Sequence, residues 1–153
     1  MKLLQYKGIS LISKIIRFQT RSLYSHSALE LDDGRVIEAW HKGGVRLLES
    51  WDEGHTKGTE IDVYKLPSML NTREAEKFLF SQLGEPYDFS SVFRFVSHTP
   101  APDNGKWFCS ELVLSAVLAG GVTLQHIRHS QASPRDVGMS PLATYLETRT
   151  CGE

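Results

Sequence analysis

The chain has 153 residues, of which 41% are hydrophobic and 23% charged, and its formal net charge is -1. This length and composition predict one domain, residues 1–153, with a real hydrophobic core. The near-neutral charge argues against a nucleic-acid-binding protein, which needs a strongly basic surface. We see neither a signal peptide nor an apolar run long enough to span a bilayer, so we expect a cytoplasmic protein.

The chain opens with a short strand around residues 3–6 and an amphipathic helix. Ser10 has the side chain of a helix N-cap, and the helix is predicted to run to about Gln19. Its apolar face predicts contact with the core. This face comprises Leu11, Ile12, Ile15 and Ile16. The region from Lys2 to Arg21 contains basic residues and no acidic ones. This charge pattern indicates either a solvated helix face or a surface for membranes or anionic substrates.

Strand patterns follow the first helix. YSHSALEL at 24–31 and RVIEAW at 35–40 are rich in β-forming residues and are joined by Asp32-Asp33-Gly34, a strong hairpin signal. TEIDVYKL at 59–66 alternates like a strand, and Pro67 ends it. These segments predict a small antiparallel sheet.

The second half of the chain is predicted to be mainly helical. One helix runs from Asn71 or Thr72 to about Leu83, and another, over 110–119, is apolar almost all round and therefore buried. A long loop with the polar tip HTPAPDNG at 98–105 lies between them. The end of the chain predicts a loop, a short helix and a frayed tail. Together the elements predict an α+β fold in which helices pack against a small antiparallel sheet.

Cys109 and Cys151 are the only cysteines, too few for a disulfide framework. A disulfide between them is the weaker interpretation, and free thiols in a reducing compartment fit better. Cys109 begins the buried helix, where unpaired backbone N–H groups and the helix dipole favour a thiolate and could hold an oxyanion. The alternative is a small, inert core residue.

A cysteine nucleophile needs a base, and six histidines compete for that role. His26 differs from the rest because it lies within a predicted strand, between small residues that leave its edge reachable. The spacing of His126 and His129 is also seen in metal sites, but no supporting cysteines or carboxylates accompany it, so we expect no metal and no cofactor. The others fall in or beside loops and are interpreted as solvated: His41, His55 and His98.

Glu38 is the candidate that would orient His26. A two-residue turn in the hairpin would place Glu38 on the opposite face of the sheet from His26. A three-residue turn with a left-handed Gly34 pairs Ala28 with Glu38, which puts Glu38 diagonally opposite His26 on the same face. An exposed strand carboxylate remains the alternative for Glu38, and His41 is the reserve for its role.

The motifs resemble the circularly permuted branch of the NlpC-type papain-like cysteine hydrolases, the YiiX-like proteins, with the lecithin retinol acyltransferase group as a more distant relative. The resemblance is carried by LISKIIRFQTRSLYSHSALEL, DDGRVIEA, LGEPYDF and WFCSELV. It implies that His26, Glu38 and Cys109 form a catalytic triad. It also places Tyr87, Ser110 and Tyr24 on the substrate or oxyanion side. Relatives often carry a Gly-Asp pair before the first strand, where this chain has Tyr6-Lys7-Gly8.

The resemblance implies a thiol hydrolase of amide bonds in short peptides or amino-acid amides, with peptidoglycan stem peptides as the favoured class. We expect a monomer or weak oligomer. The basic N-terminal region and the apolar cysteine helix favour an alternative, a lipid acyltransferase or phospholipase that acts through a thioester. A non-catalytic binding module is a further alternative, although it would need none of the three triad residues.

Overall fold

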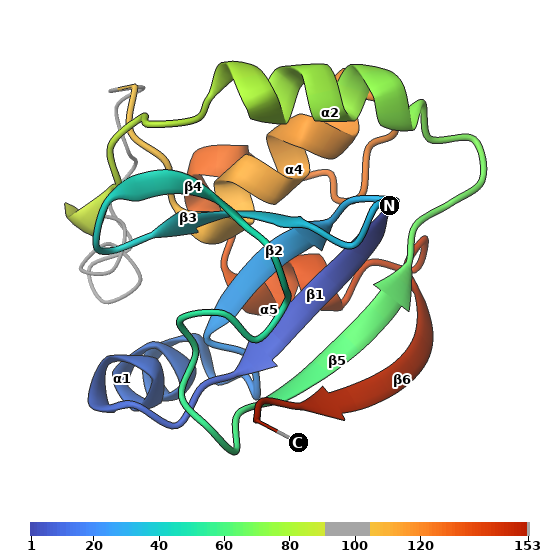
Figure 1. Ribbon diagram of the computed structural model, residues 1–153. Coiled ribbons are helices and arrows are strands. Elements are labelled where there is room, and N and C mark those ends of the chain that lie inside the picture. The colour runs from blue at the N-terminus through green and yellow to red at the C-terminus, as the bar shows by residue number, and fades with distance from the viewer. Residues whose placement is uncertain (91–104, 153) are drawn as a thin grey trace.

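The computed structural model describes residues 1–90 and 105–152. Within these residues six strands form one antiparallel sheet in the order β4-β3-β2-β1-β5-β6, with helices packed against it (Figure 1), which confirms the α+β prediction. The strands are β1 (Lys2–Lys7), β2 (His26–Glu30), β3 (Val36–Trp40), β4 (Gly44–Leu48), β5 (Glu60–Lys65) and β6 (Thr144–Thr150). The helices are α1 (Leu11–Thr20), α2 (Thr72–Ser81), α4 (Cys109–Ala119) and α5 (Pro134–Gly138), with a 3-10 turn at His129–Gln131.

The alternation of side chains along the strands gives the sheet two different faces. Leu3 and Leu29 belong to the larger core, which includes residues of α2 and α4, whereas Leu4 and Ala28 belong to a smaller cluster on the opposite face. Helix α4 packs on β2 and β3, and α2 packs on α4. The start of α4 is thereby held against the middle of the sheet.

Helix α4 is buried on nearly all sides, as its uniformly apolar sequence predicts. It ends at Gly120, where an added Cβ would collide with the side chain of Leu70 and the carbonyl of Asn71. This close approach ties the end of α4 to the start of α2.

The prediction that the apolar face of α1 is core is wrong. The helix forms as expected, with Ser10 accepting a hydrogen bond from the Ser13 N–H, but only Ile16 is buried. Leu11 is 76% exposed and Phe18 85% exposed. The reason is position: α1 lies beyond the end of β1 rather than over a face of the sheet (Figure 1).

Two strands of the sheet were not predicted from the sequence. Strand β6 pairs with β5, where a frayed tail was predicted, and Cys151 next to it is only 2% exposed. Strand β4 pairs with β3 and places Arg46 opposite Glu38. The predicted loop tip at 98–105 lies, except for its last residue, outside the described residues.

Candidate active site

Cys109 is the first residue of α4, as the sequence predicts. Because the N-cap residue is Phe108, no side-chain oxygen caps the first turn of this helix. The backbone N–H groups of Ser27, Ser110 and Cys109 each favour the charged form of the Cys109 thiol. The thiol therefore lies near the residue that follows His26 in β2.

The contact with Ser27 occurs where β2 and β3 separate. Their ladder contains the pairs Leu29↔Ile37 and Glu30↔Val36, and the same offset would pair Ser27 with Ala39. That pair is not formed, and the Ser27 N–H, which would point toward β3, instead favours the charged form of the nearby Cys109 thiol. The start of α4 thus reaches an opening between two strands.

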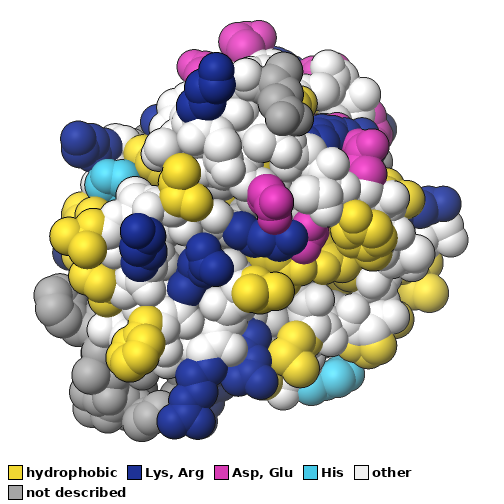
Figure 2. All heavy atoms as spheres, turned by 90° about the horizontal axis from the view of Figure 1, so that it is seen from below, with side chains coloured by type: hydrophobic (Ala, Val, Ile, Leu, Met, Phe, Trp, Pro, Cys, Tyr) yellow, Lys and Arg dark blue, Asp and Glu magenta, His cyan; other side chains and the backbone are white. Residues whose placement is uncertain are grey.

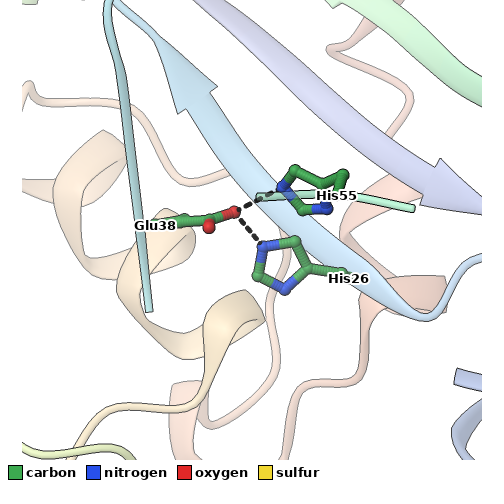
Figure 3. A group of neighbouring side chains, drawn as sticks. All are labelled: His26, Glu38 and His55. Atoms are coloured by element: carbon green, nitrogen blue, oxygen red, sulfur yellow. Dashed lines mark hydrogen bonds and ion pairs between the residues drawn. The ribbon is translucent and has the colours of Figure 1, made fainter. Parts of the chain in front are cut away.

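His26 and Glu38 bridge the same opening. The Leu31 N–H donates to the Arg35 carbonyl and Gly34 has a φ of 92°, which is the three-residue turn considered in the sequence analysis. The resulting register brings the His26 Nε2 within 2.5 Å of the Glu38 Oε2 (Figure 3). The other ring nitrogen, Nδ1, is then the one that can exchange a proton with a thiol.

His26 and Cys109 approach this opening from opposite faces of the sheet. His26 is paired with Tyr6, whose side chain belongs to the smaller cluster, whereas α4 packs on the other face. The rings of Tyr6 and Trp40 contact the imidazole of His26, at centroid distances of 5.3 Å and 5.2 Å. These rings hold the imidazole at the gap between β2 and β3.

Glu38 is fully buried and its carboxylate has three partners. Arg46 donates two hydrogen bonds to Oε1, at 2.9 Å and 2.6 Å, and the His55 Nε2 lies 3.2 Å from Oε2 (Figure 3). His55 is itself stacked on Tyr6 at a centroid distance of 4.1 Å. A buried carboxylate is tolerated because these donors replace water.

Burial and charge set the protonation states of these groups. Burial lowers the pKa of the His26 imidazole below its ordinary value, although the charge of Glu38 acts in the opposite direction. Burial would raise the pKa of Glu38, but the two imidazoles outweigh it, so that this pKa lies well below its usual range. At neutral pH the pair is therefore a neutral imidazole held by a carboxylate.

The expectation that the helix start makes Cys109 a thiolate is not met. Burial raises the pKa of the Cys109 thiol to about 12, and the backbone N–H groups of Ser27 and Ser110 offset this only in part. The side chain is 1% exposed, so desolvation outweighs the helix terminus. The thiol is protonated in this arrangement.

Tyr87 lies beside the cysteine, as the Gly84-Glu85-Pro86-Tyr87 motif implies. The Trp107 N–H donates to the Pro86 carbonyl at 2.9 Å, which sets Tyr87 next to the residues that precede Cys109. Burial raises the pKa of the Tyr87 phenol, and the nearby Cys109 adds to this effect. The phenol therefore stays protonated and can donate a hydrogen bond.

Two predicted substrate-side residues are engaged elsewhere. The Ser110 hydroxyl donates to the Ala132 carbonyl at 2.5 Å and is fully buried, so only its backbone N–H faces the thiol. The Tyr24 hydroxyl lies 2.8 Å from the Asp62 Oδ2 and 2.6 Å from the Tyr64 hydroxyl, in a separate polar cluster. The side chains of Ser110 and Tyr24 serve the structure of the fold in these positions.

A cavity of about 850 Å³ opens next to His26. His26, His55, Trp40 and Tyr87 line one part of it, and α1 lines another with largely apolar side chains. The described lining does not include Cys109. Among the described residues, the cavity therefore reaches His26 and Tyr87 but not the thiol.

One group of side chains among the described residues has the donor atoms of a metal site. The two Nε2 atoms of His26 and His55 and one carboxylate oxygen of Glu38 lie within 4.8 Å of one another. Two imidazoles and a carboxylate form a known zinc ligand set. The 2.5 Å between His26 and Glu38 is the distance of a hydrogen bond, because ligand atoms about 2.1 Å from one ion lie roughly 3 to 3.5 Å apart.

Sequence reasoning missed His55 and Arg46. His55 lies in a polar loop and was interpreted as solvated, but stacking on Tyr6 and the bond to Glu38 bury it. The two glycines before Val45 and the alternation of VRLL were the available signal for β4, which would have placed Arg46 opposite Glu38. His41 is half-buried beside Trp40, and it is Glu38 rather than His41 that hydrogen-bonds His26.

No family model and no curated protein matches this sequence. Among solved structures, the chain is similar to the metalloprotein YiiX from Escherichia coli O157:H7, with a TM-score of 0.73 and 20% sequence identity. The match covers 97% of this chain and 96% of that one. The chain therefore has a YiiX-like fold over the part that the match covers.

Proposed function

We propose that this protein is a cysteine hydrolase in which Cys109 is the nucleophile, His26 the general base and Glu38 the residue that orients His26. One observation carries the proposal: the Cys109 thiol lies near the Ser27 amide, and Ser27 follows His26, whose imidazole is hydrogen-bonded to Glu38. The resemblance to papain-like hydrolases and the YiiX-like fold support the same assignment.

The proposed reaction starts from a protonated thiol and a neutral imidazole. Nδ1 of His26 takes the proton as the Cys109 sulfur attacks the substrate carbonyl, so no ion pair forms beforehand. The backbone N–H groups of Cys109 and Ser110 stabilise the resulting oxyanion, and the Tyr87 hydroxyl is a further donor. His26 then protonates the leaving group, and water, deprotonated by His26, releases the acyl group and restores the thiol.

The first candidate substrate is an amide bond in a short peptide or amino-acid amide, the class that the resemblance implies. The second is an acyl ester or thioester of a lipid, which the apolar α1 lining of the cavity favours. Both share the acyl-enzyme at Cys109. They differ in what occupies the cavity.

The solved structure that this chain resembles is described as a metalloprotein, which raises the question of whether His26, Glu38 and His55 bind a metal ion. A divalent ion held there would act as a Lewis acid. It would need the two imidazoles to release their hydrogen bonds to Glu38, and Arg46 already neutralises that carboxylate. These residues are therefore arranged for proton sharing, and we expect Zn²⁺ to inhibit the thiol reaction.

A substrate panel tests the proposal. Wild-type protein and Cys109→Ala would be incubated with peptidoglycan fragments, amino-acid p-nitroanilides and acyl esters of increasing chain length. We expect turnover of at least one class by wild type only, with an acyl adduct on the Cys109 peptide detected by mass spectrometry. Equal turnover by both proteins would refute the proposed nucleophile.

A further inference from the structure

Helix α1 combines exposed apolar side chains with exposed bases. Leu11, Ile12 and Phe18 are all at least half exposed, and Lys14 and Arg21 are exposed beside them. Soluble proteins bury most apolar side chains of an amphipathic helix against their own core. In this protein the apolar face of α1 is left open over much of its length.

The bases lie next to the apolar side chains on the helix surface. Lys14 is three residues from Leu11 and four from Phe18, and Arg21 is three residues from Phe18, so each base adjoins an exposed apolar side chain. No acid occurs between residues 1 and 29. Among the described residues, neither Lys14 nor Arg21 has an ion pair with an acid.

The underside of the molecule, where α1 lies in Figure 1, shows this combination (Figure 2). Lys and Arg side chains lie among hydrophobic ones, and the Asp and Glu side chains visible in this view lie in its upper half. The net charge of -1 is therefore distributed unevenly over the surface. An amphipathic helix whose polar edge is basic fits the boundary between anionic headgroups and acyl chains.

The cavity connects this surface to the candidate active site. Leu11, Ile12 and Ile15 line the cavity and are also exposed on α1, and His26 lines the same cavity. An acyl chain that enters along α1 would meet apolar side chains up to the imidazole of His26.

We infer that α1 docks the protein on an anionic lipid bilayer. Leu11, Ile12 and Phe18 insert among the acyl chains, and Lys14 and Arg21 contact the anionic headgroups; these five residues are called the α1 surface below. Docking turns the α1 side of the cavity toward the bilayer. The assignment of a lipid acyl group as the substrate rests on the proposed function. Docking itself does not depend on that function.

The test is co-sedimentation of the full chain with vesicles of phosphatidylcholine alone and of phosphatidylcholine with phosphatidylglycerol. We expect binding to the anionic vesicles only, weakened by salt and retained by Cys109→Ala, so that loss of turnover and loss of docking are separable. Leu11→Ser/Phe18→Ser and Lys14→Gln/Arg21→Gln should each weaken binding about tenfold. Matched changes on α2 and in the segment just before it, Met69→Ser/Phe80→Ser and Arg73→Gln/Lys77→Gln, should leave it unchanged.

Circular dichroism and melting temperatures would confirm that all four double variants fold. Three results would overturn the inference: equal binding to both vesicle types, equal binding by the α1 and α2 variants, or no binding by wild type. Size-exclusion chromatography adds a fourth. A wild-type dimer that Leu11→Ser/Phe18→Ser dissociates, without vesicle binding, would assign the α1 surface to a second copy of the chain.

Discussion

On one side of the cavity, His26 and His55 are held by hydrogen bonds to a buried Glu38, whereas on the other side α1 contributes exposed apolar side chains. On the first side, the Nε2 atoms of both imidazoles are held by the Glu38 carboxylate, and Arg46 holds that carboxylate in turn. On the second side, Leu11 is 76% exposed and Ile12 is 50% exposed, so much of each side chain is free to contact a ligand. A rigid polar side suits proton transfer, and an open apolar side suits binding of a variable ligand.

The difference between the two sides predicts that mutations in them impair different steps of the reaction. Changes near His26 should reduce the rate of the chemical step and spare binding. Changes in α1 should reduce binding and spare the chemical step.

The largest expected effect is that of Cys109→Ala. Without the sulfur no acyl-enzyme forms, so kcat/KM should fall by about 10³-fold or more. Cys151→Ala is the matched control, because Cys151 is equally buried but lies at the far end of β6. The prediction is checked with the best substrate of the panel, and a comparable loss in Cys151→Ala would contradict it.

His26→Gln should reduce kcat by about 10²- to 10⁴-fold, the usual contribution of a general base. Substrate binding should change little, since the cavity keeps its shape. His129→Gln is the control, because His129 bonds Ser115 away from the cavity. A large rise in KM with unchanged kcat would show that His26 binds substrate and does not transfer protons.

Glu38→Gln should lower the rate about a hundredfold and shift its pH profile. Activity requires neutral His26, so it is present above the pKa of His26 and lost below it. Burial places this pKa below 6.5, and the charge of Glu38 raises it. Removing that charge should move the acidic limb to lower pH. A shift to higher pH would contradict the assigned role of Glu38.

Changes in the α1 surface should have a smaller effect, confined to KM. Leu11→Ser/Phe18→Ser should raise KM for a long-chain acyl ester about tenfold and leave kcat unchanged, because only apolar contacts are lost. Short-chain esters should be unaffected. Phe80→Ser on α2 is the control for loss of an exposed aromatic side chain. A fall in kcat would link α1 to the chemical step.

His55→Asn should have the smallest effect on uninhibited turnover, a loss of about a few-fold, since Arg46 still holds the Glu38 carboxylate. It should also weaken inhibition by Zn²⁺, because one of three ligands is gone. Inhibition constants measured in both proteins check this. Activation of wild type by Zn²⁺ would contradict the thiol mechanism.

The polar side of the cavity was largely predictable from the sequence. The Asp32-Asp33-Gly34 turn sets the register that brings Glu38 to His26, and turn chemistry is local information. The start of α4 at Cys109 was also predictable, because the apolar run begins there. Arg46 was missed together with β4, a short strand that begins at Gly44.

The apolar side was not predictable, because helical periodicity shows that a helix is amphipathic and not what covers its apolar face. Helices α1 and α2 have similar patterns, yet α2 packs on α4 while α1 lies beyond the sheet. The pKa of Cys109 was mispredicted for a related reason. A helix start was visible in the sequence, but the complete burial of the thiol depends on the strands around it.

The most direct test of the acid–base pair is the rate of Cys109 alkylation by iodoacetamide across pH, in wild type and in His26→Gln. The thiol alone should react only as the pH rises toward its pKa of about 12. If His26 accepts its proton, wild type should show an additional step with an inflection below 6.5, and His26→Gln should lack it. Superimposable profiles for the two proteins would contradict the proposal that these residues act together.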